Sequence, residues 1–95
     1  MAQPSDSETE PSNTFYMYVV YLLVSIPMPS RKYVGITNDP HRRLIEHNNG
    51  QSIHTNRFKP WKLMTYVVFD HLSKAQAFER YLKSHSGRAF AKKHL

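Results

Sequence analysis

The stretch YMYVVYLLVSIPMPSRKYVGITNDPHRRLIEHN, residues 16–48, decides the fold. Residues 16–24 are dense in Tyr, Val and Leu and lack helix caps, which predicts a mostly buried strand ending before the IPMP break at residues 26–29. Residues 31–37 predict a second, shorter strand. Because the connection between the two is short, we expect them to form an antiparallel hairpin.

A helix is predicted directly after the hairpin. Asn38 and Asp39 supply an N-cap, and Pro40 suits the first helical position. The sequence NNG at residues 48–50 supplies a C-terminal stop. The sequence therefore predicts a helix over residues 40–48.

Downstream of this helix the pattern changes twice. Residues 51–60 are polar and basic and show no periodicity, which predicts a loop. Residues 61–69 predict a third strand, because their β-branched content is high and apolar or β-branched side chains recur at every second position. We expect these alternating side chains, Leu63, Thr65, Val67 and Phe69, to share one face.

A second helix is predicted over residues 73–84. Ser73 and Gln76 form a capping-box pattern at its start, and apolar residues then follow at helical spacing. Gly87 is expected to end it. The basic remainder to Leu95 predicts either one more short helix or a frayed tail.

The chain is expected to hold one domain preceded by a tail. Residues 1–14 are rich in Ser, Thr, Pro and Glu and have no apolar periodicity, so we expect a disordered tail there and a domain over residues 15–95. The predicted fold class is α+β, with a small three-stranded antiparallel sheet flanked by helices. Its elements follow in the order β-β-α-β-α, with or without a further short helix.

Charge divides the chain at the same place. Residues 1–14 hold three acids and no base, a charge of −3, whereas the other 81 residues hold 13 bases against four acids, a charge of +9. A positive excess of this size attracts polyanions, of which nucleic acid is the commonest. The alternative is a basic surface that binds no such partner.

Several classes of protein are excluded by what the sequence lacks. The chain has no cysteine, which rules out a disulfide framework, a Cys-ligated metal and a Cys nucleophile. The longest apolar run, residues 15–26, falls short of the roughly 18 residues needed to span a bilayer, and no basic stretch precedes it as in a secretory signal. We therefore expect a cytoplasmic protein without membrane association.

Two pairs of side chains are candidates for chemistry. Tyr21 and Tyr33 lie on the two hairpin strands, where their phenols could be neighbours; the alternative is two packed aromatic side chains. Arg43 and His47 are four residues apart on the first helix and share a face, whereas Arg42 points elsewhere. The alternative for this pair is a solvated basic helix face.

Glu79 is one of only four acids in residues 15–95. It could bind a divalent cation, or it could form an ordinary ion pair with Lys83 four residues later. A single carboxylate suits Mg²⁺ only because this ion often keeps most of its waters and takes other ligands from substrate phosphates.

Several motifs follow one another in a characteristic order. Val19-Val20-Tyr21 is followed, after eleven residues, by Tyr33-Val34-Gly35 and then by NDPHRRLIEHNNG at residues 38–50. The segments HTNRFKPWKL at residues 54–63 and AFERYLK at residues 77–83 come later. This succession resembles the GIY-YIG nuclease family, and more narrowly its small stand-alone bacterial members. The likeness covers about residues 16–90.

The resemblance implies a role for each matching residue. Tyr21 matches the general base, Arg43 the residue that stabilises the charge of the transition state, and Glu79 the ligand of one Mg²⁺ or Mn²⁺ ion. Tyr33 and His47 match residues that orient the attacking water or assist proton transfer.

The resemblance also implies a substrate-binding set. Val19 stands where the family has a glycine, and His54 matches a further loop histidine. Gly35 would let backbone and substrate approach closely, because any side chain would obstruct them. The residues expected to bind substrate are Gly35, Lys32, His54, Arg57, Phe58, Lys59 and Trp61.

The function implied is a metal-dependent endonuclease that hydrolyses phosphodiester bonds of DNA. We expect single-stranded DNA as substrate, with Phe58 and Trp61 stacking on bases, and no obligate protein partner. One alternative is a structure-specific nuclease acting on branched or duplex DNA. Another is a nucleic-acid-binding module without catalysis that uses Arg57, Lys59, Trp61 and the basic C-terminus, and a third is a structural or protein-interaction domain.

Overall fold

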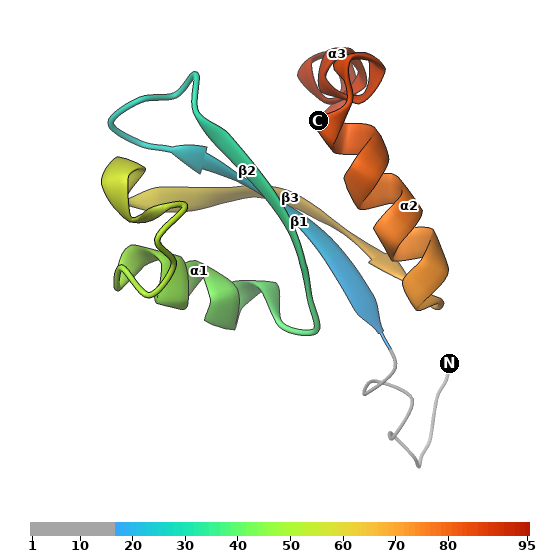
Figure 1. Cartoon of the computed structure of the whole chain (residues 1–95), viewed down its shortest axis with the longest axis horizontal. Helices are drawn as coiled ribbons and strands as arrows, with labels where there is room; N and C mark the ends of the chain where they lie inside the picture. Colours follow the sequence, from blue (N-terminus) through green and yellow to red (C-terminus); the bar gives the residue numbers. More distant parts are fainter. Residues whose placement is uncertain (1–16) are drawn as a thin grey trace.

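The computed structural model describes residues 17–95, so the predicted tail over residues 1–14 and the predicted strand start at Tyr16 lie outside the described residues. Figure 1 shows a small sheet with helices on both sides. The elements are β1 (Tyr18–Ser25), β2 (Lys32–Thr37), α1 (Pro40–Asn48), the 3₁₀ turn η2 (Asn56–Phe58), β3 (Trp61–Phe69), α2 (Leu72–Lys83) and α3 (His85–His94).

The sheet is antiparallel and has the strand order β2-β1-β3. The first two strands form the predicted hairpin, in which Tyr21 pairs with Gly35 and Leu23 with Tyr33. The central strand β1 is buried from Val19 to Ser25, because both faces of the sheet are covered. The predicted α+β class is confirmed.

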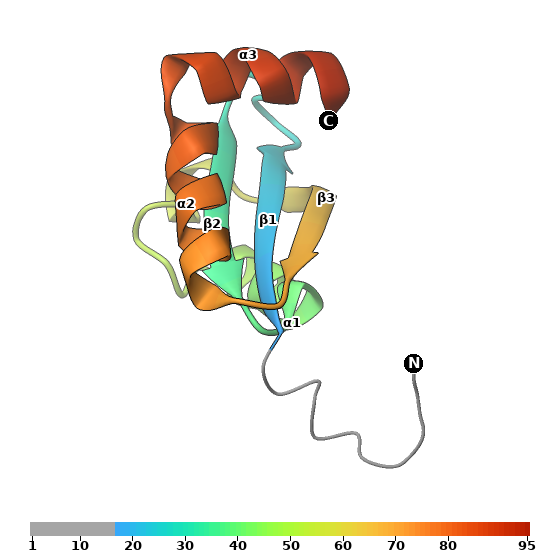
Figure 2. The same cartoon turned by 90° about the vertical axis from the view of Figure 1, so that its right-hand side faces the viewer.

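The two faces of the sheet have separate cores. Tyr21, Leu23 and Trp61 are buried on the face that α1 covers. Val20 belongs to the opposite core, where α2 supplies buried Ala75 and Leu82 and where side chains of α3 also pack. Figure 2 shows α3 lying across the end of the sheet above α2. Successive β1 residues therefore enter different cores, as the alternation of strand side chains requires.

The pairing of β1 with β3 contains a β-bulge. The register shifts between Leu22 and Leu23, and Met64 is the extra residue on β3. Leu63 consequently packs in the core under α1, whereas Phe69 packs in the core under α2. The prediction that the alternating residues of β3 share one face is wrong, because a bulge reverses the phase of alternation.

Helix α1 has the predicted bounds and the predicted caps. The Asp39 side chain accepts a hydrogen bond from the Arg42 backbone N–H at 3.1 Å, and Pro40 occupies the first turn. The helix ends at Asn48, and Gly50 follows with a φ of 78°, a conformation that glycine adopts without strain. These caps fix the direction in which α1 leaves the hairpin.

The start of α2 and its junction with α3 differ from prediction. Helix α2 begins at Leu72, and its N-cap His71 makes no side-chain capping bond, so the predicted capping box at Ser73 is wrong. Gly87 does not end α2 but lies in the first turn of α3, whose N-cap is Ser84. A Cβ on Gly87 would overlap the backbone carbonyl of Tyr81, and the glycine is therefore needed for the tight turn between the helices.

The residues after α2 form the further short helix that was one of the two predicted outcomes. None of the helices in residues 17–95 is both long and apolar enough to cross a bilayer.

Candidate active site

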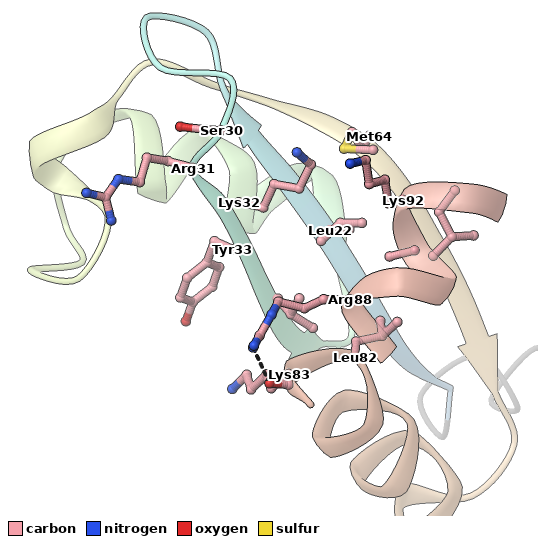
Figure 3. Close-up of a pocket in the computed structure, with 13 residues that line it drawn as sticks. Leu22, Ser30, Arg31, Lys32, Tyr33, Met64, Leu82, Lys83, Arg88 and Lys92 are labelled. Atoms are coloured by element: carbon pink, nitrogen blue, oxygen red, sulfur yellow. Dashed lines mark hydrogen bonds between the residues drawn. The ribbon is translucent and has the colours of Figure 1, made fainter. Parts of the chain in front are cut away.

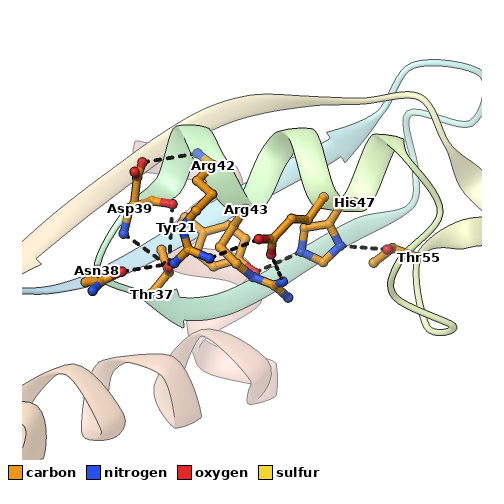
Figure 4. Close-up of polar contacts among 9 residues, drawn as sticks. Tyr21, Thr37, Asn38, Asp39, Arg42, Arg43, His47 and Thr55 are labelled. Carbon is orange, nitrogen blue, oxygen red and sulfur yellow. Dashed lines mark hydrogen bonds and ion pairs between the residues drawn. The ribbon is translucent and has the colours of Figure 1, made fainter.

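Three buried side chains form a hydrogen-bonded chain under α1. The Tyr21 hydroxyl lies 2.9 Å from His47 Nε2, and His47 Nδ1 lies 2.6 Å from Thr55 Oγ1 (Figure 4). Tyr21 is 1% exposed, and His47 and Thr55 are fully buried. Both ring nitrogens of the histidine therefore have a partner, which removes the penalty of burying an unpaired polar group.

Gly35 makes room for the tyrosine of this chain. Tyr21 and Gly35 are paired across the hairpin, and a Cβ on Gly35 would come within 2.6 Å of the Tyr21 hydroxyl oxygen. Any side chain at this position would displace the phenol. The observed role of Gly35 is thus to seat Tyr21, and its predicted contact with substrate stays a prediction.

Tyr33 and Arg43 lie beside the buried chain. The Tyr33 ring centroid is 4.9 Å from that of His47 and 6.1 Å from that of Tyr21, so the two phenols are neighbours, which was one of the two arrangements considered. Arg43 forms an ion pair with Glu46, whereas Arg42 points outward and bonds Glu46 and Asn38. The predicted common face of Arg43 and His47 is confirmed (Figure 4).

Burial sets the protonation state of the two central groups. It raises the pKa of the Tyr21 phenol above its usual value, and the neighbouring Arg43 guanidinium only partly opposes this. Burial also lowers the pKa of His47, and the positive charge of Arg43 lowers it further. At neutral pH the structure therefore holds a neutral phenol against a neutral imidazole.

Glu79 lies on α2, on the other side of the sheet from Tyr21, and its carboxylate is 3.1 Å from Lys83 Nζ. The ion pair considered for this residue is thus present. No cluster of three or more His, Asp or Glu side chains occurs within residues 17–95. A lone carboxylate oxygen donor fits a hard cation such as Mg²⁺ or Mn²⁺ that keeps its waters and takes further oxygens from a phosphate.

The predicted substrate-binding residues separate into exposed and packed groups. Trp61 is 4% exposed, and its indole N–H donates to the Thr55 carbonyl at 2.9 Å. Its predicted stacking on bases is therefore wrong, because the ring belongs to the core. Phe58 is half-buried beneath the guanidinium groups of Arg31 and Arg57. The remaining side chains are exposed and lie outside the buried chain: Lys32, His54, Arg57 and Lys59.

Thr55 is the site residue that the sequence did not reveal. A threonine in a polar loop is ordinary, and its neighbour His54 attracted the prediction instead. The loop between α1 and β3 is held down by Asn48, whose side-chain amide bonds both the backbone N–H and the carbonyl of Trp61. These contacts place Thr55 against His47. The one hint of them in the sequence is Asn48, a polar residue at the end of α1 beside the loop that follows it.

Comparisons with known proteins give close relatives for most of the chain. Proteins named structure-specific endonuclease subunit SLX1 are similar to it in three yeasts. The relative from Scheffersomyces stipitis is 46% identical over 65% of this chain and 20% of its own length. The relative from Debaryomyces hansenii is 40% identical over 70% of this chain and 21% of its own length. The relative from Malassezia globosa is 36% identical over 76% of this chain and 17% of its own length. The chain thus spans about a fifth of these relatives.

Two expectations need correction in the light of these relatives. The proteins are eukaryotic, so the narrower likeness to small stand-alone bacterial members is not supported. They are also named as subunits, which gives no support to the expectation that no protein partner is needed. The broader resemblance is confirmed, because residues 17–93 match the family model described as the GIY-YIG catalytic domain. The chain therefore belongs to the GIY-YIG nuclease family.

Proposed function

We propose that this chain is the catalytic domain of a divalent-metal-dependent endonuclease that cuts DNA where its structure changes, at a branch or where duplex meets single strand. The observation that carries the proposal is the buried chain of Tyr21, His47 and Thr55 beside Arg43, in a domain of a nuclease family. The names of the relatives favour a structure-specific substrate over plain single-stranded DNA.

Tyr21 serves as the general base in this proposal, with His47 as its proton acceptor. Because burial raises the pKa of the phenol, a phenolate is not formed in advance. The attacking water gives a proton to Tyr21 Oη while the phenol passes its own proton to His47 Nε2, 2.9 Å away. The water oxygen then bonds to phosphorus, and the bond to the leaving oxygen breaks.

Thr55 and Arg43 support the two ends of this transfer. We assign the single proton of neutral His47 to Nδ1, where it is donated to Thr55 Oγ1, so that Nε2 is free to accept. Arg43 presents a planar guanidinium beside Tyr21, where it stabilises the negative charge that grows on the phosphate.

Glu79 is the residue proposed to hold the metal. A bound Mg²⁺ or Mn²⁺ would withdraw charge from the scissile phosphate and stabilise the leaving oxygen. Before that, the Glu79 carboxylate must give up its ion pair with Lys83, which costs little because the Lys83 side chain is more than half exposed.

The test uses three DNA substrates of matched sequence: a single strand, a blunt duplex and a branched molecule. The full chain is incubated with each in Mg²⁺ and in EDTA, and products are resolved on denaturing gels. We expect cuts near the branch point in Mg²⁺ and none in EDTA. Binding to all three without any cleavage would favour the non-catalytic module, for which the Glu79–Lys83 pair is the structural argument.

A further inference from the structure

A groove of about 860 Å³ lies on the face of the sheet opposite the Tyr21–His47 chain (Figure 3). It runs where the start of β2 faces the end of α2 and the length of α3. Its volume falls in the range of about 300 to 1,000 Å³ that is usual for ligand sites. Side chains from five elements or their connections line it, and those that matter here are cationic or apolar.

The rim of the groove is strongly positive. Its cationic residues are Arg31, Lys32, Lys83, Arg88 and Lys92, and no acidic residue lines it. Lys83 is paired with Glu79. The other four rim cations form no ion pair with a carboxylate of residues 17–95. The Arg88 guanidinium is held toward the groove by a hydrogen bond to the Lys83 carbonyl at 2.7 Å. A rim of uncompensated cations attracts a polyanion.

The floor of the groove is apolar. It is formed by Leu22, Val34, Leu82, Ala91 and Leu95. A double helix keeps its bases stacked and exposes only their edges, so it cannot lay the face of a base on this floor. A single strand can place its phosphates on the cations and an unstacked base against the apolar floor or the Tyr33 ring beside it; a positive track with an aromatic ring for stacking is the pattern of single-strand grooves.

The groove ends at the two parts of the proposed catalytic machinery. Tyr33 lines it, and the same ring lies 4.9 Å by centroid from His47. Lys83 lines it, and its ammonium is 3.1 Å from Glu79. A strand in the groove would therefore lie along the edge strand β2, between the phenol cluster and the candidate metal ligand.

We propose that this groove binds the single-stranded segment of the substrate, next to the bond that is cut. The inference rests on the proposed function and deepens it, because it names the part of a branched DNA that the domain recognises and the residues that recognise it. The discriminating groups are Lys32 on β2 and Lys92 on α3, which face one another across the groove (Figure 3).

The chain offers a matched control for these two lysines. Lys32 and Lys62 are both register partners of Val24, one on each side of β1, and both are exposed. Lys93 follows Lys92 on α3 and is exposed as well. Neither Lys62 nor Lys93 lines the groove. The double variants Lys32→Gln/Lys92→Gln and Lys62→Gln/Lys93→Gln thus remove the same charge, each from one of the strands that flank β1 and from α3.

The experiment measures binding of the full chain to labelled single-stranded DNA and to a blunt duplex by fluorescence anisotropy. EDTA prevents cleavage, and the salt concentration is varied. The logarithm of the binding constant falls with the logarithm of salt concentration. For single-stranded DNA we expect Lys32→Gln/Lys92→Gln, the groove variant, to make this slope less steep by about 1.4, since each lost phosphate contact contributes about 0.7. Lys62→Gln/Lys93→Gln, the control variant, should change this slope clearly less. Binding to the blunt duplex should be the same for the two variants. Thermal midpoints of both variants verify that they are folded.

Two results would overturn the inference. If both variants weaken single-strand binding equally, the groove is not a binding site. If the groove variant weakens duplex binding as strongly as single-strand binding, the site holds a duplex arm. Cleavage of branched DNA by the unaltered chain is scored separately. If the chain cuts branched DNA but the groove variant shows no selective loss of single-strand binding, only this inference is refuted. If that selective loss occurs but the chain does not cut, the proposed function is refuted and single-strand binding is established.

Discussion

On the face of the sheet covered by α1, the buried side chains include a phenol, an imidazole and a threonine hydroxyl, joined by hydrogen bonds. On the face covered by α2 and α3, the buried residues are Val20, Ala75 and Leu82, with apolar side chains around them. One strand, β1, supplies both cores from alternate residues.

The two cores contribute differently to stability and to chemistry. Burying a Leu or Val side chain stabilises the fold by about 1.5 to 3 kcal/mol, whereas an intramolecular hydrogen bond contributes a net of about 0.5 to 1.5 kcal/mol. The hydrogen bonds of the core under α1 therefore add less stability than buried apolar side chains do, but they hold titratable groups in fixed positions. Substitutions of the polar groups in the core under α1 should accordingly affect activity more than stability.

The largest expected effect comes from Glu79, which flanks the apolar core but is proposed to act in chemistry. Glu79→Gln should abolish Mg²⁺-dependent cleavage, because the amide is a poor ligand, while DNA binding is kept or tightens as a negative charge is lost. Gel assays and anisotropy measure the two quantities. The matched control is Asp70→Asn, which breaks the other acid-first i,i+4 pair, with Lys74, and should leave cleavage unchanged. Full cleavage activity in Glu79→Gln would contradict the proposal that Glu79 holds the metal.

Arg43 should show the next largest effect. Arg43→Lys keeps the charge but loses the planar fork, so turnover should fall by about 10²-fold with the fold intact. Arg42→Lys is the control on the adjacent residue and should be mild, because Arg42 is exposed and points away from Tyr21. If the order of the two effects were reversed, the assignment of the α1 face would be wrong.

Leu82 tests the apolar core under α2 and α3. Leu82→Ala removes a buried side chain and should lower the free energy of unfolding by about 2 to 5 kcal/mol, as measured by urea titration. Leu72→Ala, on the same helix but 43% exposed, should cost far less. Equal losses for the two leucines would contradict the assigned core.

His47 should give the smallest effect, a dependence of stability on pH. Its pKa is lowered in the folded chain from the usual 6.5, so the unfolded state binds more protons as pH falls below 6.5, and stability decreases there. Thermal midpoints of the unaltered chain should therefore fall from neutral to mildly acidic pH, and His47→Gln should fall less. His41→Gln, an exposed histidine of α1, should follow the unaltered chain.

Local patterns predicted much of this fold and part of the candidate site. The hairpin followed from a run dense in Tyr, Val and Leu and from its short connection, and α1 from the Asp39 cap and Gly50; all of these signals act within a few residues. Tyr21 and Arg43 lie side by side, as the family resemblance implied.

What the sequence did not predict depends on contacts between distant segments. The bulge at Met64 is a property of how β3 aligns with β1, and no pattern within β3 shows it. Trp61 was expected to stack on bases, but its pairing with Ser25 draws it into the core. Thr55 meets His47 only because the loop after α1 turns back beneath the helix.

The central claim is that the Tyr21 hydroxyl takes part in cleavage, and a pair of tyrosine variants tests it most directly. Tyr66 is the register partner of Tyr21 on β3 and is 45% exposed, so Tyr21→Phe and Tyr66→Phe delete the same atom from neighbouring positions. Initial rates on branched DNA in Mg²⁺ should fall by about 10²-fold or more for Tyr21→Phe, with an unchanged circular dichroism spectrum, and should stay near the unaltered rate for Tyr66→Phe. Equal rates for the two folded variants would contradict the proposed mechanism.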